Sequence, residues 1–276
     1  MFRDDDMSDR MEINGHVCAF EMKGSGPFLT LLHSVGLSTR QGWRYQRDVL
    51  AERFRVLSYD FRGLGQSSRG VGEVGVDIYV NDLSTLLDEL GVERTALMGV
   101  SLGGFVAQKF AARYANKVTA LALVSTAPKI YSGHAQRRAE RNDRIRAQGM
   151  SAAAGHQIDS HFPAEFAAAN PDVIAWYRKH YLANDPQTYI DVMDDLGRYD
   201  STPDLPRITA PTMIVAGEAD HSSVAGSVPL ESARALHTGI AGSRLVTIPG
   251  AFHYPHIDHA PAFNDAVIPF LREFAR

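Results

Sequence analysis

Residues Gly99-Val100-Ser101-Leu102-Gly103 form a G-x-S-x-G motif, and this motif decides the predicted fold. The motif follows a short apolar run at 95–100 and precedes a segment with the apolar spacing of a helix. A serine in this setting stands on a strained strand-to-helix turn that lifts its hydroxyl above the end of a parallel sheet. Larger side chains two positions away on either side would collide, which explains both glycines. Ser101 is therefore a candidate nucleophile, and a glycine-rich turn without chemistry is the alternative.

The segments around this motif alternate between strand-like and helix-like patterns. Such alternation predicts an α/β fold with a mostly parallel central sheet flanked by helices. A lysine-to-proline turn at 23–27 follows a strand-like stretch at 12–21, and together they suggest an antiparallel hairpin at the sheet edge. An apolar stripe at helical spacing predicts one covering helix. The stripe is formed by Tyr79, Leu83, Leu86, Leu87 and Leu90, and the short apolar runs lie at 28–32, 55–59, 95–100, 120–124, 212–216 and 244–248.

One stretch, about 131–206, breaks this alternation because it contains no strand-like run. It is predicted to be a helical cap inserted into one domain, whose core is formed by 12–130 and 207–276. Residues 1–11 are predicted to be a loose tail. The cap carries five arginines that either clamp a substrate carboxylate or form a solvated helix face. They are Arg137, Arg138, Arg141, Arg144 and Arg146.

Composition excludes several classes of protein. The chain has 28 basic and 32 acidic residues, a net charge of −4, and no dense basic block, so nucleic acid is not the expected partner. No window has the 18 or so apolar residues of a membrane span, and no membrane association is predicted. The acidic start lacks the apolar stretch of a secretory leader, which predicts a cytoplasmic protein. The one cysteine, Cys18, excludes an intramolecular disulfide and a four-thiolate metal site.

A serine nucleophile needs a base, and the base needs a carboxylate to orient it. His253 follows the last apolar run and precedes a final helical pattern, so it lies in a loop at the carboxyl end of the sheet. Asp220 occupies the equivalent loop one strand earlier. The order Ser101, Asp220, His253 is the one expected for a serine on such a turn, so these three are the predicted catalytic residues. The rival acids are Glu218, Asp194 and Asp195.

A tetrahedral intermediate needs N–H donors for its oxyanion. The predicted donors are the backbone N–H of Leu102, directly after the nucleophile, and that of Val35 in the loop after the 28–32 strand. His33 is expected to brace this loop through a backbone hydrogen bond rather than to act in catalysis. Candidate substrate contacts are His33, Ser34 and Trp176, although the aromatic group Trp176, Tyr177 and Tyr181 also suits packing of the cap on the core.

Several motifs in order resemble one known family. They are His33-Ser34-Val35-Gly36, the stretch 55–67 that includes Asp60-Phe61-Arg62-Gly63, the stretch 125–130, the stretch 207–211, and Pro249-Gly250-Ala251-Phe252-His253. From about residue 12 to 276 the chain resembles the α/β-hydrolase superfamily, and in detail its 3-oxoadipate enol-lactonase branch. The resemblance implies hydrolysis of a small ester or lactone without a cofactor. The chain departs from the branch at His221, directly after Asp220, and in the cap, so substrate identity does not carry over.

Other functions are weighed against this one. His253, His256, His259 and Asp258 invite a metal site, but several histidines on one loop more often form a polar surface, and no metal is predicted. An aspartate-nucleophile hydrolase is disfavoured because position 101 is serine. A carbon–carbon hydrolase, a cofactor-free perhydrolase and a ligand receptor with slow turnover stay open, as does a homodimer.

Overall fold

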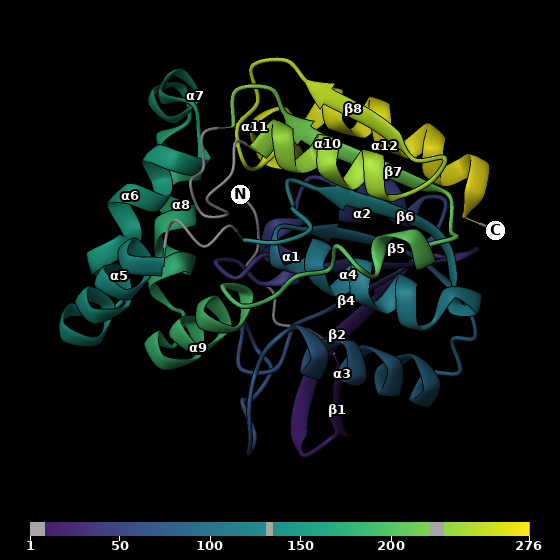
Figure 1. Cartoon of the computed structure of the whole chain (residues 1–276), viewed down its shortest axis with the longest axis horizontal. Coiled ribbons are helices and arrows are strands. Elements are labelled where there is room, and N and C mark those ends of the chain that lie inside the picture. Colours follow the sequence, from purple (N-terminus) through teal and green to yellow (C-terminus); the bar gives the residue numbers. More distant parts are fainter. Residues whose placement is uncertain (1–8, 131–134, 221–228, 276) are drawn as a thin grey trace.

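The computed structural model describes residues 9–130, 135–220 and 229–275. Within them the centre of the molecule is one mixed sheet with strand order β1-β2-β4-β3-β5-β6-β7-β8 (Figure 1). β2 is antiparallel to β1 and β4, whereas all neighbours from β4 to β8 are parallel. The strands are β1 Asp9–Ile13, β2 His16–Lys23, β3 Phe28–Leu32, β4 Arg55–Tyr59, β5 Thr95–Val100, β6 Val118–Val124, β7 Thr212–Gly217 and β8 Arg244–Ile248.

Helices cover both faces of the sheet, as predicted. α3, α4 and α10 lie on one face, and α2 and α12 lie on the other (Figure 1). No helix of the described residues is long and apolar enough to cross a membrane. The core helices are α1 Thr39–Gly42, α2 Arg47–Ala51, α3 Val76–Glu89, α4 Leu102–Arg113, α10 Pro229–Gly239, α11 Pro255–Asp258 and α12 Ala260–Phe274, with 3-10 turns at η1 Ala115–Lys117 and η3 Leu205–Arg207.

The N-terminal boundary differs from the predicted one. The predicted loose tail reached residue 11, but β1 begins at Asp9, whose Cα is paired with that of Phe20 in β2. Asn14 and Gly15 both have positive φ, of 44° and 76°, which suits a two-residue hairpin turn between twisted strands. The tail prediction is therefore wrong for residues 9–11, and residues 1–8 lie outside the described residues. β2 continues past this hairpin to pair with β4.

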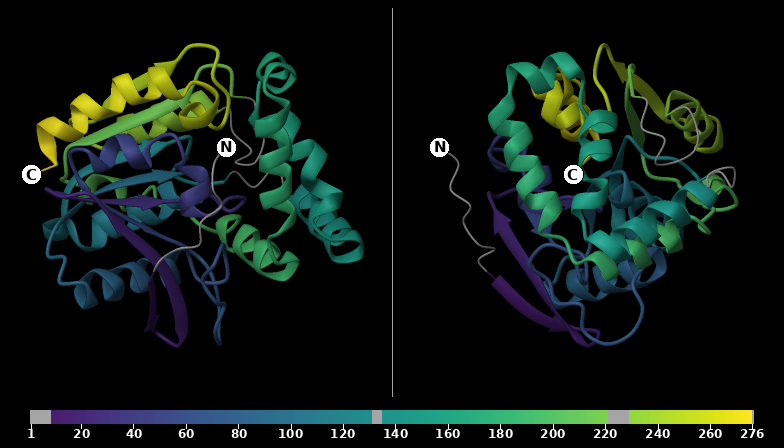
Figure 2. Two further views of the ribbon diagram at one scale, coloured as in Figure 1. Left: turned by 180° about the vertical axis from the view of Figure 1, so that it is seen from behind. Right: turned by 90° about the vertical axis from the view of Figure 1, so that its left-hand side faces the viewer.

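The predicted cap region contains five helices and no strand in the part that the structure describes. Its helices project from one end of the sheet (Figure 2). An isolated antiparallel bridge between Lys129 and Asp200 joins the segment that enters the cap to the segment that leaves it. The cap helices are α5 Ala135–Gln148, α6 Ser151–His161, α7 Ala164–Ala169, α8 Pro171–Leu182 and α9 Pro186–Leu196.

Polar contacts fix α9 of the cap to the core. Arg69 forms an ion pair with Asp191 at 2.6 Å and donates to the hydroxyl of Thr188 at 2.9 Å. Asp195 accepts a hydrogen bond at 2.9 Å from the backbone N–H of Val76, at the start of α3. A carboxylate is favourable there because the first N–H groups of a helix have no partner within it. These contacts fix the position of the cap over the carboxyl end of the sheet.

Candidate active site

Ser101 lies on a strained turn between β5 and α4. Its φ of 53° and ψ of −114° are rare for a residue with a side chain, so the turn stores strain. A Cβ on Gly99 would lie 2.3 Å from the carbonyl oxygen of Gly103. A Cβ on Gly103 would lie 2.3 Å from the carbonyl oxygen of Leu32 in β3. Glycine is therefore required on both sides of the serine by close backbone approach, which is the geometry that the motif predicts.

Replacing Gly103 by alanine is expected to lower the free energy of unfolding by about 1–3 kcal/mol, because the new Cβ overlaps backbone that cannot yield cheaply. The same push displaces the end of β3 and the loop that follows it, so hydrolytic activity should fall as well. Denaturant titration and initial rates measure the two effects. Gly155→Ala in α6 is the control, since a Cβ there meets no atom within 4 Å. Unchanged stability and activity of Gly103→Ala would contradict the described turn.

Asp220 and His253 form a buried pair. Nδ1 of His253 lies 3.0 Å from Oδ2 of Asp220, and the two residues are 6% and 4% exposed. Backbone hydrogen bonds join their loops, since the N–H of Ala219 donates to the carbonyl of Ala251 at 3.0 Å. Ser101, Asp220 and His253 thus follow the carboxyl ends of β5, β7 and β8, which meet at one edge of the sheet. This pairing fixes the tautomer of His253 with its proton on Nδ1.

The rival acids are placed elsewhere. Glu218 is exposed. Asp194 accepts a hydrogen bond at 2.8 Å from Asn142 within the cap, and Asp195 is bonded to the start of α3. Of these carboxylates, Asp220 is the one that contacts His253.

The two predicted oxyanion donors are available for a ligand. Leu102 is the first residue of α4, so its N–H has no acceptor within the helix. Within the described residues, neither Leu102 nor Val35 donates a backbone hydrogen bond. Both residues are buried, at 0% and 8% exposure, and preorganised donors are stronger in a site that excludes water.

His33 braces the loop that carries Val35. Its Nδ1 lies 2.6 Å from the carbonyl oxygen of Ser34, and its Nε2 accepts from the backbone N–H of Phe61 at 2.9 Å. Burial lowers the pKa of this fully buried ring, which keeps it neutral as the Phe61 bond requires. Both ring nitrogens are engaged, so the placement agrees with the bracing interpretation and leaves no nitrogen for a substrate.

Ser34 and Trp176, the other predicted substrate contacts, have protein partners. The hydroxyl of Tyr254 donates to Oγ of Ser34 at 3.1 Å, which ties the Val35 loop to the loop of His253. Trp176 is half-buried, and the guanidinium of Arg44 lies 4.2 Å from the centre of its ring. Trp176 therefore packs the cap against the core, which was the alternative to a substrate contact.

His161, the cap residue that covers His253, was not among the sequence-predicted site residues, whereas Tyr177 was expected to pack the cap on the core. The ring of His161, the last residue of α6, stacks on that of His253 with centroids 4.6 Å apart. Tyr177 of α8 is fully buried and lies 3.1 Å from Nδ1 of His161 through its hydroxyl. No pattern in the sequence marks these contacts, because they depend on how the cap helices pack on the core.

The histidines after His253 do not converge. His256 is fully buried with its ring 4.6 Å from that of Trp43, and burial lowers its pKa to about 3. Nδ1 of His259 lies 3.0 Å from a carboxylate oxygen of Asp258. In the described ranges no group of three metal-ligating side chains is close enough to hold an ion. Cys18 is buried in β2, and burial raises the pKa of its thiol to about 12.

Comparison with known proteins places the chain among hydrolases. It is 25% identical over 248 residues to 3-oxoadipate enol-lactonase 2 of Acinetobacter baylyi, with 90% of each chain covered. It is 31% identical over 281 residues to polyketide synthase ThaQ of Burkholderia thailandensis, and it spans only 13% of that protein's length. The solved enol-lactonase of Burkholderia xenovorans LB400 superposes with a TM-score of 0.88 at 29% identity, over 96% of this chain and all of that one.

The family model described as alpha/beta hydrolase fold matches residues 27–260, which is most of the chain. The predicted resemblance to this superfamily and to its enol-lactonase-like branch is thereby confirmed. With a strained serine turn at the edge of a mostly parallel sheet, the protein belongs to the alpha/beta hydrolase fold family.

Proposed function

We propose that the protein is a serine hydrolase that cleaves a small carboxylic ester or lactone. The observation that carries this proposal is the buried hydrogen bond between His253 and Asp220, at the edge where the sheet presents Ser101. A neutral imidazole oriented by a carboxylate is the base that a serine nucleophile requires. The enol-lactonases among the similar proteins support the choice of a lactone or ester.

The proposed reaction has two halves. Oγ of Ser101 attacks the carbonyl carbon while Nε2 of His253 takes the hydroxyl proton, and the N–H groups of Val35 and Leu102 stabilise the oxyanion. The carbon–oxygen bond then breaks, and His253 returns the proton to the leaving alkoxide. Water, deprotonated by His253, attacks the acyl-enzyme; the acyl–Oγ bond then breaks, His253 returns the proton to Ser101, and the acid is released. In a lactone the alcohol and acyl parts belong to one molecule, which stays bound to Ser101 until this second half.

A hydrolysis panel tests the substrate class. It contains enol-lactones, simple lactones and p-nitrophenyl esters of increasing chain length, each measured with wild type and with Ser101→Ala. We expect repeated turnover of at least one class by wild type and none above background by the variant. Stoichiometric binding of these compounds without turnover would instead indicate a receptor.

The cap adds a candidate subsite for an anionic part of the substrate. A cavity of about 280 Å³ is lined in part by the apolar side chains of Ile130, Ala153 and Met193. Gln157 also lines the cavity and lies four residues, about 6 Å along the axis of α6, before His161, whose ring covers His253. Four arginines of α5 line the cavity. The negative groups close to them are two carboxylates: Glu140, which also lines the cavity, and Asp194, which is paired with Arg138. The four arginines are Arg137, Arg138, Arg141 and Arg144.

The excess of guanidinium groups favours substrates that carry a carboxylate at the end distant from the scissile bond. Arg144→Gln is expected to lower kcat/KM about fivefold for the p-nitrophenyl half-ester of a dicarboxylic acid, and to leave a neutral ester of equal length unchanged. The difference should shrink at high salt because the arginine is exposed.

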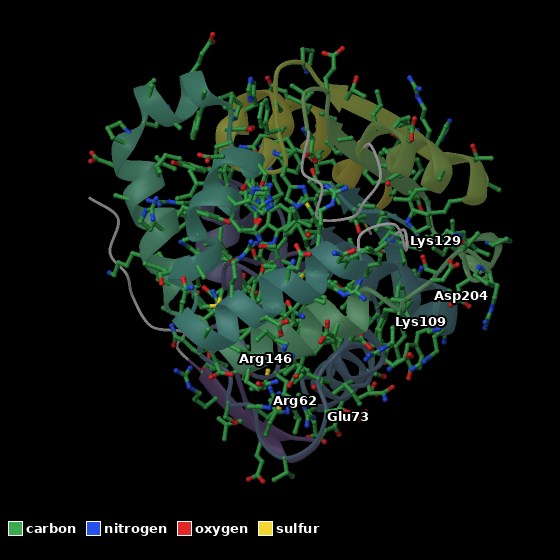
Figure 3. All side chains as sticks on the ribbon, turned by 60° about the vertical axis from the view of Figure 1, so that its left-hand side comes forward. Arg62, Glu73, Lys109, Lys129, Arg146 and Asp204 are labelled. Carbon is green, nitrogen blue, oxygen red and sulfur yellow. The ribbon has the colours of Figure 1, made fainter. Side chains whose placement is uncertain are left out.

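The matched control is Arg146→Gln. Arg146 lies on the same helix and is labelled in Figure 3. It forms an ion pair with Asp143 at 2.8 Å and is not among the residues that line the cavity. Equal losses in the two variants, or an equal loss for the neutral ester, would show that the arginines form only a solvated helix face.

A further inference from the structure

His161 of the cap lies directly against the imidazole of His253. The two ring planes are inclined by 24° with centroids 4.6 Å apart, so the rings meet face to face. His161 is only 4% exposed. The ring of Tyr254 closes one side, edge-on to His161 at 5.0 Å. A second imidazole, supplied by the cap, therefore covers one face of the proposed base.

A hydrogen bond to Tyr177 of α8 fixes the plane of this second ring. Tyr177 is fully buried, and its ring centroid lies 6.4 Å from that of His161 and 5.9 Å from that of Tyr254. The hydroxyl of Tyr177 lies within hydrogen-bond distance of Nδ1 of His161, at 3.1 Å. Nε2 of His161 has no hydrogen-bond partner in the described protein, so Tyr177 is the polar contact that orients the ring.

The ring of His161 is neutral. Burial lowers its pKa well below the usual value, and the neighbouring His253 and His156 lower it further. The titratable groups of the described residues that face the stacked pair are Asp220 after β7, His156 on α6, Tyr177 on α8, and Tyr254 and His256 on the His253 loop. Asp220 bonds to His253 on the edge of its ring rather than on the stacked face.

The face of the His161 ring lies next to a positive charge when His253 takes the proton of Ser101 and becomes an imidazolium. A cation held over the face of an aromatic ring within about 6 Å is stabilised, and more so where water is excluded. We propose that His161 is a positioning residue that fixes the ring of His253 and stabilises its imidazolium form; this rests on the proposed function of the triad. The hydrogen bond to Tyr177 explains why a histidine stands here, since it sets the plane of the ring.

Three variants test this role by steady-state kinetics over pH 5 to 9. His161→Leu removes the aromatic face and should lower kcat about tenfold with little change in KM. The acid limb of its kcat/KM profile should move to lower pH. Without the aromatic face the imidazolium form of His253 is less stable, so His253 stays unprotonated to a lower pH. His161→Phe keeps the face and should retain most of the rate and the position of the limb.

Tyr177→Phe is the third variant. It removes the hydroxyl that orients His161 and keeps the imidazole of His161 itself. It should lower kcat in the wild-type background and have no further effect in the His161→Phe background. Melting temperatures of all variants exclude loss of folded protein as the cause. An acid limb that stays in place in His161→Leu, or equal impairment by Leu and Phe, would overturn the role of His161. Activity retained in Ser101→Ala would instead overturn the proposed function itself.

Discussion

Replacing Ser101 by alanine is expected to lower kcat for the best ester or lactone on the order of 10⁶-fold, because the acyl-enzyme route is lost entirely. Oxyanion donors and substrate binding remain, so a small residual rate above uncatalysed hydrolysis should persist. KM should change little, since Oγ contributes to the reacting bond rather than to ground-state binding. Initial rates with a p-nitrophenyl ester, at enzyme concentrations high enough to detect the residual rate, measure the loss.

Ser125→Ala is the control for this variant. Ser125 also follows the end of a parallel strand and also has a positive φ, of 44°, and its hydroxyl has no hydrogen-bond partner in the described protein. It should keep nearly full activity. A Ser101→Ala enzyme with rates close to wild type would show that the strained turn does not carry the nucleophile.

Replacing Asp220 by asparagine is expected to lower kcat about 10⁴-fold. The amide keeps the size of the side chain but can donate to Nδ1 of His253, which favours the tautomer with its proton on Nε2. That nitrogen could then no longer take the proton of Ser101. The loss of charge also removes stabilisation of the imidazolium that forms in each half-reaction.

Glu218→Gln is the matched control, since Glu218 lies in the same loop and is exposed. Its rates should equal those of wild type. A large loss in Glu218→Gln together with a small one in Asp220→Asn would reassign the acid. Double replacement of Asp220 and His253 should cost little more than His253→Ala alone, because residues that act as a unit are not additive.

The central strands could be predicted because they are buried on both faces: the apolar runs at 28–32, 55–59 and 95–100 coincide with β3, β4 and β5. The run at 244–248 coincides with β8, an edge strand that is partly exposed. β1 was missed in part because it is an edge strand: Asp9 and Arg10 are exposed, and Ile13 is the one fully buried residue. Its start is set by backbone pairing with β2, which leaves no hydrophobic signal in the sequence.

The positions of the catalytic candidates follow from a general rule of parallel sheets, that loops after the strands meet at one edge. That rule brought Asp220 and His253 together without any knowledge of side-chain packing. The cap offers no such rule. Trp176 and Tyr177 are adjacent on α8, yet the tryptophan packs on Arg44 and the tyrosine faces the catalytic loops. Which of two neighbours on a helix faces inward depends on the orientation of the whole helix.

Covalent labelling tests the central claim, that Ser101 is the nucleophile, most directly. The protein is treated with a fluorophosphonate, digested with trypsin and mapped by mass spectrometry. Ser101 is the one serine of the tryptic peptide 95–109, so the modified peptide identifies the residue. We expect stoichiometric label on this peptide, loss of hydrolysis in parallel, and no label in Ser101→Ala. Label on another peptide with the same loss of activity, or full activity after Ser101 is labelled, would contradict the account.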